Sequence, residues 1–191
     1  AEVGADRRPI PGTERHYDCD TLLLSCGLIP ENELTRALGA DISPVTNGPL
    51  VNERLETSVS GVFACGNVLH VHDLVDYVSQ EAAAAGRAAA NYAAEGEPTA
   101  HEIPIAISGG ARYTVPATLD PSCIREDLTV RFRVGSVMRS RRIVVTFDGE
   151  PVVQKKRPIL APGEMEQVVL TPAMFAAHPN VQDIKISIEE A

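Results

Sequence analysis

The sequence predicts two units, an α/β unit followed by an all-β unit. The first half carries short apolar runs that end in glycine, as buried strands do, and then a long alanine-rich helix. The second half alternates with period two between turn signals, as a sheet does. Net charge changes at the same point, because residues 1–102 hold six Lys and Arg against sixteen Asp and Glu, whereas residues 103–191 hold eleven against ten. We therefore expect a domain boundary near residue 100.

The run TSVSGVFACGN at residues 57–67 predicts a strand at Val62–Cys65, buried on both faces and halted by Gly66. In open α/β sheets, ligands bind at the carboxyl ends of the strands. A glycine there lets a ligand approach the backbone, and the amide of Asn67 can hold a sugar hydroxyl. The alternative is an ordinary buried strand that ends in a Gly-Asn turn.

Two more strands are expected before this one. Residues 20–34 read DTLLLSCGLIPENEL, an apolar strand followed by an acidic turn and a short helix. Pro30 cannot continue a hydrogen-bond ladder, so the chain must leave the sheet there. The other strand is expected at Leu50–Thr57, which reads LVNERLET.

Together these elements resemble the flavin-binding half of the pyridine nucleotide-disulfide oxidoreductase superfamily, especially its thioredoxin-reductase-like branch. In that family the second flavin motif ends in Gly-Asp, and the Asp accepts a hydrogen bond from a ribityl hydroxyl of FAD. Here Asn67 stands at that position, after Gly66. The resemblance implies that residues 1–29 are the tail of an NAD(P)-binding domain with its crossover. It also implies that residues 30–98 are the C-terminal part of a Rossmann-like FAD-binding domain.

The phosphate-binding fingerprint G-x-G-x-x-G is missing from the chain. That fingerprint places a pyrophosphate at a helix N-terminus, so the phosphates of FAD and NAD(P) are not held here. The chain also begins with Ala1 and not with Met. We therefore expect the C-terminal portion of a longer FAD-dependent, NAD(P)-linked oxidoreductase. The 191-residue chain itself is expected to be flavin-free, inactive and prone to self-association through exposed edges and apolar faces.

Residues 81–96 read EAAAAGRAAANYAAEG and predict a helix of small side chains, whose axis can lie close to a neighbouring element. The resemblance implies that the amino end of this helix points at the flavin pyrimidine ring, with Val78, Ser79 and Gln80 at that end. Backbone N–H groups there would stabilise negative charge on a reduced flavin.

His70, His72 and Asp73 lie between the glycine turn and the helix. Alternating histidines on a strand put both rings on one face, but a metal site needs a third and a fourth ligand, and the sequence indicates none. We therefore expect no metal. Solvated or hydrogen-bonded loop histidines are one interpretation. The other is a catalytic role beside the flavin, where an imidazole moves a proton.

Composition excludes several classes of protein. No apolar run reaches eighteen residues, so no membrane span is expected. The acidic first half and an aromatic content of only 4% argue against nucleic-acid binding. The four cysteines form no C-x-x-C pair. We expect reduced cysteines, most of them in or beside apolar strands, in a cytoplasmic protein. A redox pair of Cys26 and Cys65 is the alternative.

Residues 103–191 predict a small antiparallel, Ig-like β-sandwich. We expect strands at Arg112–Val115, Leu128–Val134, Arg142–Phe147 and Ile184–Ile188, and a helix at Pro172–Ala177. A hairpin through Asp148-Gly149 would bring two basic clusters, Arg139, Arg141 and Arg142 with Lys155, Lys156 and Arg157, onto neighbouring strands. These clusters form either a solvated face, or a docking surface for an acidic partner subunit or the acidic first half, or a contact with anionic lipid.

Two functions of different classes follow. In the first, the chain supplies ribityl and flavin-ring contacts to an FAD-dependent oxidoreductase. In the second, it is a non-catalytic assembly or subunit-docking module on a degenerate flavoprotein scaffold. The first is favoured, because a scaffold needs neither a close-approach glycine nor a sugar-binding amide after it.

Overall fold

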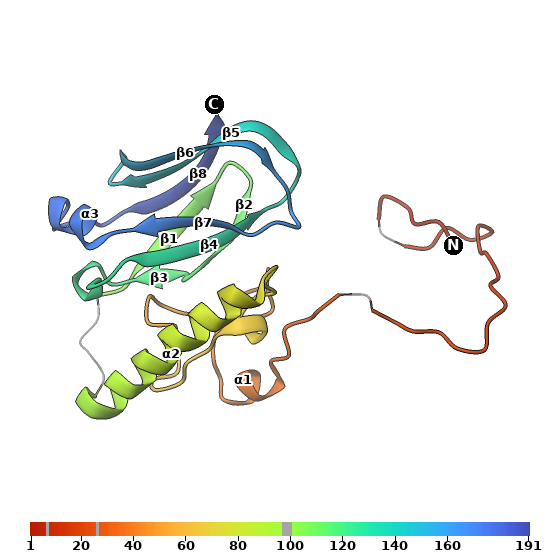
Figure 1. Ribbon diagram of the computed structural model, residues 1–191, viewed down its shortest axis with the longest axis horizontal. Helices are drawn as coiled ribbons and strands as arrows, with labels where there is room; N and C mark the ends of the chain where they lie inside the picture. The colour runs from red at the N-terminus through yellow and green to blue at the C-terminus, as the bar shows by residue number, and fades with distance from the viewer. Residues whose placement is uncertain (7, 26, 97–100) are drawn as a thin grey trace.

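Two β-sheets make up the second half of the chain in the computed structural model, which describes residues 1–6, 8–25, 27–96 and 101–191 (Figure 1). One sheet has five strands in the order β3-β1-β8-β5-β6, and the other has three in the order β2-β4-β7. The strands are β1 (Ile103–Ser108), β2 (Ala111–Val115), β3 (Thr118–Leu119), β4 (Leu128–Val134), β5 (Met138–Phe147), β6 (Glu150–Leu160), β7 (Glu166–Leu170) and β8 (Ile184–Glu190). A 3-10 turn, η2 (Pro121–Cys123), and a helix, α3 (Pro172–Ala177), complete this half.

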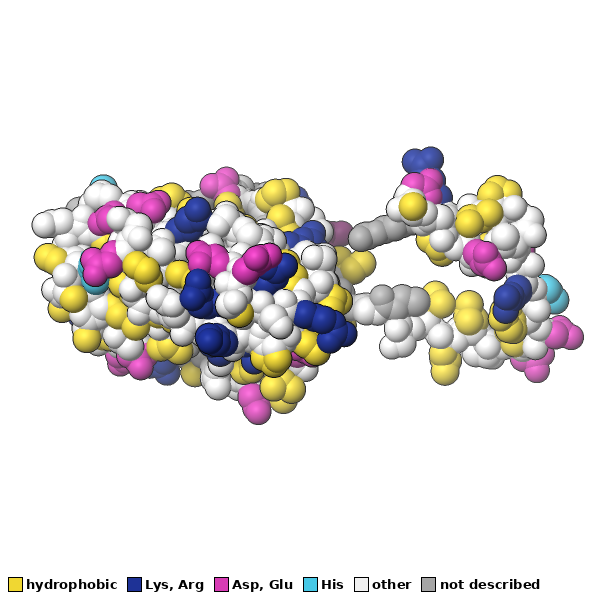
Figure 2. Space-filling view, turned by 90° about the horizontal axis from the view of Figure 1, so that it is seen from above, with side chains coloured by type: hydrophobic (Ala, Val, Ile, Leu, Met, Phe, Trp, Pro, Cys, Tyr) yellow, Lys and Arg dark blue, Asp and Glu magenta, His cyan; other side chains and the backbone are white. Residues whose placement is uncertain are grey.

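The expected hairpin joins β5 to β6. Its turn residues, Asp148 and Gly149, have φ of 49° and 84°, as a two-residue primed turn requires. Arg141 lies opposite Arg157, so the two basic clusters do occupy neighbouring strands. Figure 2 looks onto this side of the molecule and shows Lys and Arg side chains gathered there with acidic side chains between them.

One strand pairing differs from the prediction. β1 runs parallel to β8, with Ile105 opposite Ile184, whereas the other pairings among the described strands are antiparallel. The sheet is therefore mixed and not purely antiparallel. Strands that are far apart in sequence and not joined by a hairpin are free to pair in parallel, and local alternation carries no information on this choice.

The main core lies between the two sheets. Its side chains come from alternate positions of both, as the period of two predicts, and several are fully buried. The largest are Leu119, Phe132, Ile143, Phe147, Leu160, Leu170, Ile184 and Ile186. Phe175 of α3 covers one end of this core and stacks on Phe147 at 5.0 Å between ring centroids.

The first half is mostly irregular chain around two helices. These are α1 (Glu33–Ala37) and α2 (Val75–Glu95), with a 3-10 turn, η1 (Gly66–Val68), between them. A short helix after Pro30 and a long alanine-rich helix were both expected from the sequence. None of the helices in the described part of the chain combines the length and the apolar character that crossing a membrane needs.

Three predicted strands of the first half do not form. Val62–Cys65 contributes one isolated bridge, from Phe63 to Glu56, and is only partly buried. Leu50–Thr57 contributes short bridges only. Residues 20–25 are extended but unpaired. A strand is held by the hydrogen-bond ladder to its neighbours, so an apolar run without a partner strand stays irregular.

Residues 1–29 form an arm that runs away from the rest of the molecule (Figure 1). The hydrogen bonds of its described residues are local, such as Gly4 N–H to Arg8 O and Ile10 N–H to Glu2 O. Its apolar side chains face solvent, and Leu23 is 89% exposed. The first anchor to the body is Asn32, whose side-chain amide donates to Asn47 O and to Val68 O.

A second, smaller core joins the two halves. Val51, Leu55, Leu69 and Ala85 from the first half pack with Val115 of β2. Figure 1 shows α2 running below the sheet that contains β4. The first half is thus folded onto the β unit and not merely linked to it.

Removal of residues 1–29 should leave the free energy of unfolding within about 0.5 kcal/mol of the intact chain, because the arm buries nothing on the body. Urea denaturation of both chains followed by circular dichroism measures this. As a control, removal of residues 1–37 also takes away Asn32 and should cost more than about 1 kcal/mol. An equal loss in the free energy of unfolding for the two truncations would contradict the conclusion that residues 1–29 make no stabilising contact with the body.

Candidate functional site

Glu81 of α2 is the centre of a buried polar cluster. Its side chain is 2% exposed, and its Oε1 lies 2.9 Å from Nε2 of His70, 2.9 Å from Nε2 of His72 and 3.3 Å from Nη1 of Arg131. Its Oε2 accepts a hydrogen bond from the N–H of Gly66 at 3.0 Å. One carboxylate therefore holds together the glycine turn, the histidine loop, α2 and β4.

The two rings of the His-x-His motif do lie together, with centroids 4.3 Å apart, but they are buried and not solvated. His70 Nε2 is hydrogen-bonded to Glu81, and its Nδ1 lies 3.4 Å from the hydroxyl of Tyr113 on β2. Within the described residues, neither ring nitrogen of His72 has a hydrogen-bond partner. The close approach of His72 to Glu81 is therefore not a well-aligned hydrogen bond.

The glycine turn is built around Gly66, whose φ is +72°, a value that favours glycine over every other residue. A Cβ atom at this position would lie 3.2 Å from Cγ1 of Val78 on α2. The close approach at Gly66 is thus made by α2. Asn67 is exposed, and its Oδ1 accepts a hydrogen bond from the N–H of His72 at 3.1 Å.

α2 begins at Val75, several residues before the helix expected at residues 81–96. Val78, Ser79 and Gln80, which were expected at the amino end of the helix, therefore lie in its first two turns. Its N-cap residue makes no side-chain capping bond. Ser79 and Gln80 are exposed, and Gln80 Oε1 accepts a hydrogen bond from Nη2 of Arg131 at 2.9 Å.

β4 supplies two cations that contact the first half. Arg131 contacts Glu81 and Gln80, and its guanidinium lies 5.1 Å from the ring centroid of Tyr77. Arg133 forms an ion pair with Asp73 and donates to Val71 O. Arg133 thus holds the loop that contains the two histidines, and Arg131 holds α2.

Burial and hydrogen bonding determine which side chains of this cluster are ionised. Burial would raise the pKa of Glu81, but the hydrogen bond to His70 and the charge interactions with His70 and His72 outweigh it and lower this pKa to about 2. Burial lowers the pKa of His70 despite the adjacent carboxylate. At neutral pH, Glu81 is therefore ionised and His70 is a neutral donor, with Arg131 as the permanent countercharge. Burial and the charge of Glu81 raise the pKa of the nearby Cys65 thiol.

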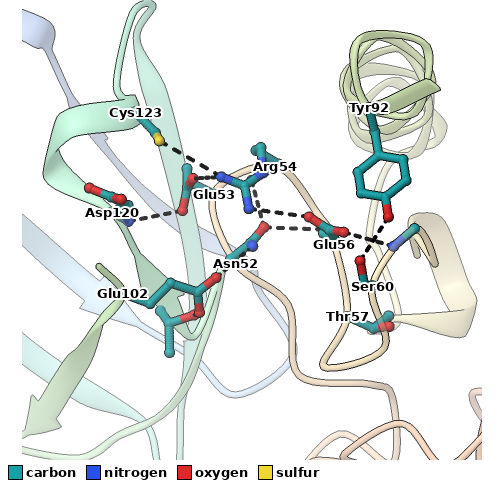
Figure 3. A network of polar contacts seen from close by, with 12 residues as sticks. Asn52, Glu53, Arg54, Glu56, Thr57, Ser60, Tyr92, Glu102, Asp120 and Cys123 are labelled. Carbon is teal, nitrogen blue, oxygen red and sulfur yellow. Dashed lines mark hydrogen bonds and ion pairs between the residues drawn. The ribbon is translucent and has the colours of Figure 1, made fainter. Parts of the chain in front are cut away.

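A second polar network fixes the turn at residues 52–56 against the β unit (Figure 3). Asn52 Oδ1 accepts from the N–H groups of Arg54 and Glu56, and its amide donates to Glu102 at 2.7 Å. Arg54 is held between Glu53 and Glu56 at 3.0 and 3.2 Å. The carboxylate of Glu53 also accepts from the N–H of Asp120 at 3.0 Å. These contacts orient a turn in which Leu55 has a φ of 61°.

Between α2 and the β unit lies a groove of about 750 Å³. Its lining includes Glu81, Gln80 and Arg131 from the first cluster and Arg54 and Cys123 from the second network. Both polar networks therefore open onto the same concave surface.

A family model for pyridine nucleotide-disulphide oxidoreductases matches residues 2–90. Residues 2–90 are similar to that family. The match includes the run 57–67 and ends inside α2, so the β unit lies outside it. No curated protein and no solved structure matches the chain. The predicted resemblance to the pyridine nucleotide-disulphide oxidoreductases is thereby confirmed for the first half.

Within the matched segment, the sequence analysis missed Glu81, and in the β unit it missed Arg131. Both carried a signal. Glu81 and Ala85 are the buried residues of α2 and lie one helical turn apart. In the sequence, the signal was an acidic residue on the same helix face as small side chains, which indicates a buried partner for its charge. Arg131 stands between buried Val130 and Phe132 and is itself 5% exposed. Cys26, half of the proposed redox pair, lies outside the described residues.

Replacing Glu81 by Gln should lower the free energy of unfolding by about 3 kcal/mol, because it leaves the buried guanidinium of Arg131 without its countercharge. Urea denaturation in the presence of EDTA measures this loss. Glu95→Gln, an exposed carboxylate at the end of the same helix, is the matched control and should change stability by less than about 0.5 kcal/mol. Similar effects of the two substitutions would show that Glu81 is not a structural centre.

Asn52→Ala should cost about 2 kcal/mol, because it removes two acceptor bonds to backbone N–H groups and leaves that of buried Glu56 unsatisfied. Thermal and urea denaturation report the loss. Asn91→Ala removes an exposed amide from α2 and is expected to be nearly neutral. A loss below about 0.5 kcal/mol for Asn52→Ala would mean that the turn is held by other contacts.

Proposed function

We propose that this chain is the C-terminal portion of an FAD-dependent, NAD(P)-linked oxidoreductase and that its first half supplies ribityl and flavin-ring contacts. The observation that carries the proposal is the family match over residues 2–90, which includes the Gly66-Asn67 turn. Bound FAD would supply the electron or hydride transfer. The assembly-module alternative gains no support from this match.

The donor atoms of the first half suit the sugar end of the cofactor. Asn67 presents an exposed amide next to a left-handed glycine, and its Oδ1 accepts one internal hydrogen bond, which leaves a second lone pair for a ribityl hydroxyl. Ser79 and Gln80 are exposed on the first two turns of α2. The positive end of the helix dipole lies at these turns and favours negative charge. The phosphates would be held elsewhere, since the sequence lacks the fingerprint for them.

His70 and His72 are proposed to position the residues that contact the flavin and not to act on the substrate directly. Both are buried against Glu81, and His72 N–H orients the amide of Asn67. A change at the histidines would therefore reach the flavin through Asn67. Substrate protonation would fall to groups that face the groove.

The proposal also covers the fold and docking surface of the β unit and the location of the protein in the cell. We propose that the β unit is an Ig-like sandwich that docks a partner subunit or a second copy, through the β5–β6 face or through the exposed apolar arm. Arg142 and Lys156 lie side by side on that face and suit an acidic surface. A cytoplasmic location completes the proposal.

Asn67→Leu should weaken FAD binding about five- to tenfold in the longer flavoprotein that contains this segment, because one hydrogen bond to the ribityl chain is lost. Flavin absorbance after dialysis against limiting FAD measures occupancy. Asn67→Asp restores the residue that the family carries and retains both acceptor bonds, so its occupancy should equal or exceed that of the natural protein. Unchanged affinity in Asn67→Leu would refute the role given to Asn67.

A further inference from the structure

We propose that His70, His72 and Glu81 bind a divalent transition-metal ion, with Zn²⁺ as the ion that best suits their donor atoms. All three residues are buried, and one ligand atom from each lies within 4.8 Å of the others. Two imidazole nitrogens and one carboxylate oxygen suit Zn²⁺, whereas Mg²⁺ and Ca²⁺ prefer oxygen ligands only. The sequence indicated no third ligand, and the packing of α2 provides it. The inference does not depend on the flavin proposal.

His72 provides the observation that a purely hydrogen-bonded cluster does not explain. Its side chain is fully buried, and neither Nδ1 nor Nε2 has a hydrogen-bond partner in the described part of the chain. Buried polar atoms are normally paired. Nε2 nevertheless lies 2.9 Å from Oε1 of Glu81, out of line for donating a proton to it. A bound ion accounts for both facts, since it sits on the lone-pair axis of the nitrogen while a tetrahedral site places the next ligand off that axis.

The surroundings of the cluster resemble the outer contacts of metal sites, in which each ligand is held by a further hydrogen bond. Nδ1 of His70 faces the hydroxyl of Tyr113 at 3.4 Å, which directs Nε2 toward the cluster. Oε2 of Glu81 accepts from Gly66 N–H at 3.0 Å.

Arg131 is compatible with a cation at this position. Its guanidinium is also held by Gln80 at 2.9 Å and by the ring of Tyr77. Its 3.3 Å contact with Glu81 leaves a lone pair of Oε1 for the ion. Arginine here orients the carboxylate and does not fill the site.

The cluster also has a path to solvent. Glu81 lines the groove of about 750 Å³ between α2 and the β unit. Arg131 lines the same groove, whereas His70 and His72 do not. The site has three protein ligands, so a water molecule from the groove would complete a tetrahedral site.

Titration of the EDTA-treated 191-residue chain with Co²⁺ tests the site. We expect one Co²⁺ per chain, the visible absorption of a four-coordinate nitrogen and oxygen site without a thiolate-to-metal band, and displacement by Zn²⁺. A thiolate band would assign the ion to Cys65 or Cys19 and would overturn the proposal.

Variants locate the ion. His72→Gln should weaken Co²⁺ binding at least about 100-fold, and Tyr113→Phe, which keeps all three ligands, should weaken it about tenfold. His178→Gln is the matched control, since His178 lies 3.5 Å from Glu150 but belongs to no three-ligand cluster among the described residues, and its binding should be unchanged. Absence of stoichiometric binding, or equal binding in His72→Gln and His178→Gln, would overturn the proposal. If His72→Gln does not fold, the Tyr113→Phe result decides in the same way.

Discussion

The ionised carboxylate of Glu81, buried between two halves of the chain, is the constraint around which the first half is arranged. A buried charge is tolerated only when donors surround it. The glycine turn supplies a backbone N–H, His70 of the loop supplies an imidazole and β4 supplies a guanidinium. Each donor fixes one element relative to α2. The position of α2, which is otherwise a helix of small and interchangeable alanines, is thus determined by one side chain.

This constraint makes the β unit part of the structure of the first half. Arg131 and Arg133 of β4 hold α2 and the histidine loop, and the turn around Asn52 is tied to Glu102. An apolar core shared with Val115 supports the same contact. Residues proposed to face a flavin are therefore kept in place by a unit that lies outside the family match. A partner bound to the β unit would act on the flavin contacts through these same side chains.

Local patterns predicted the second half well and the first half poorly. β4 and α3 have the bounds expected from alternation and from the helix signal, and the Asp148-Gly149 turn forms its hairpin. The strands β1, β3 and β7 were missed, since β1 contains a proline and β3 and β7 are short. The strands predicted at Val62–Cys65 and Leu50–Thr57 do not form, and the reason is different. A strand is completed by its neighbours, and alternation or apolarity in one segment does not provide them.

The sequence by itself determined the family resemblance of the first half, the helices and the pairing of His70 with His72, because each depends on residues close together in the chain. Only the tertiary structure decided that Glu81 meets Arg131, fifty residues away, and that the two histidines turn inward. A local pattern specifies which face a side chain takes. Which charges are removed from water together depends on how distant elements pack, and that packing turned a loop motif into a buried three-ligand cluster.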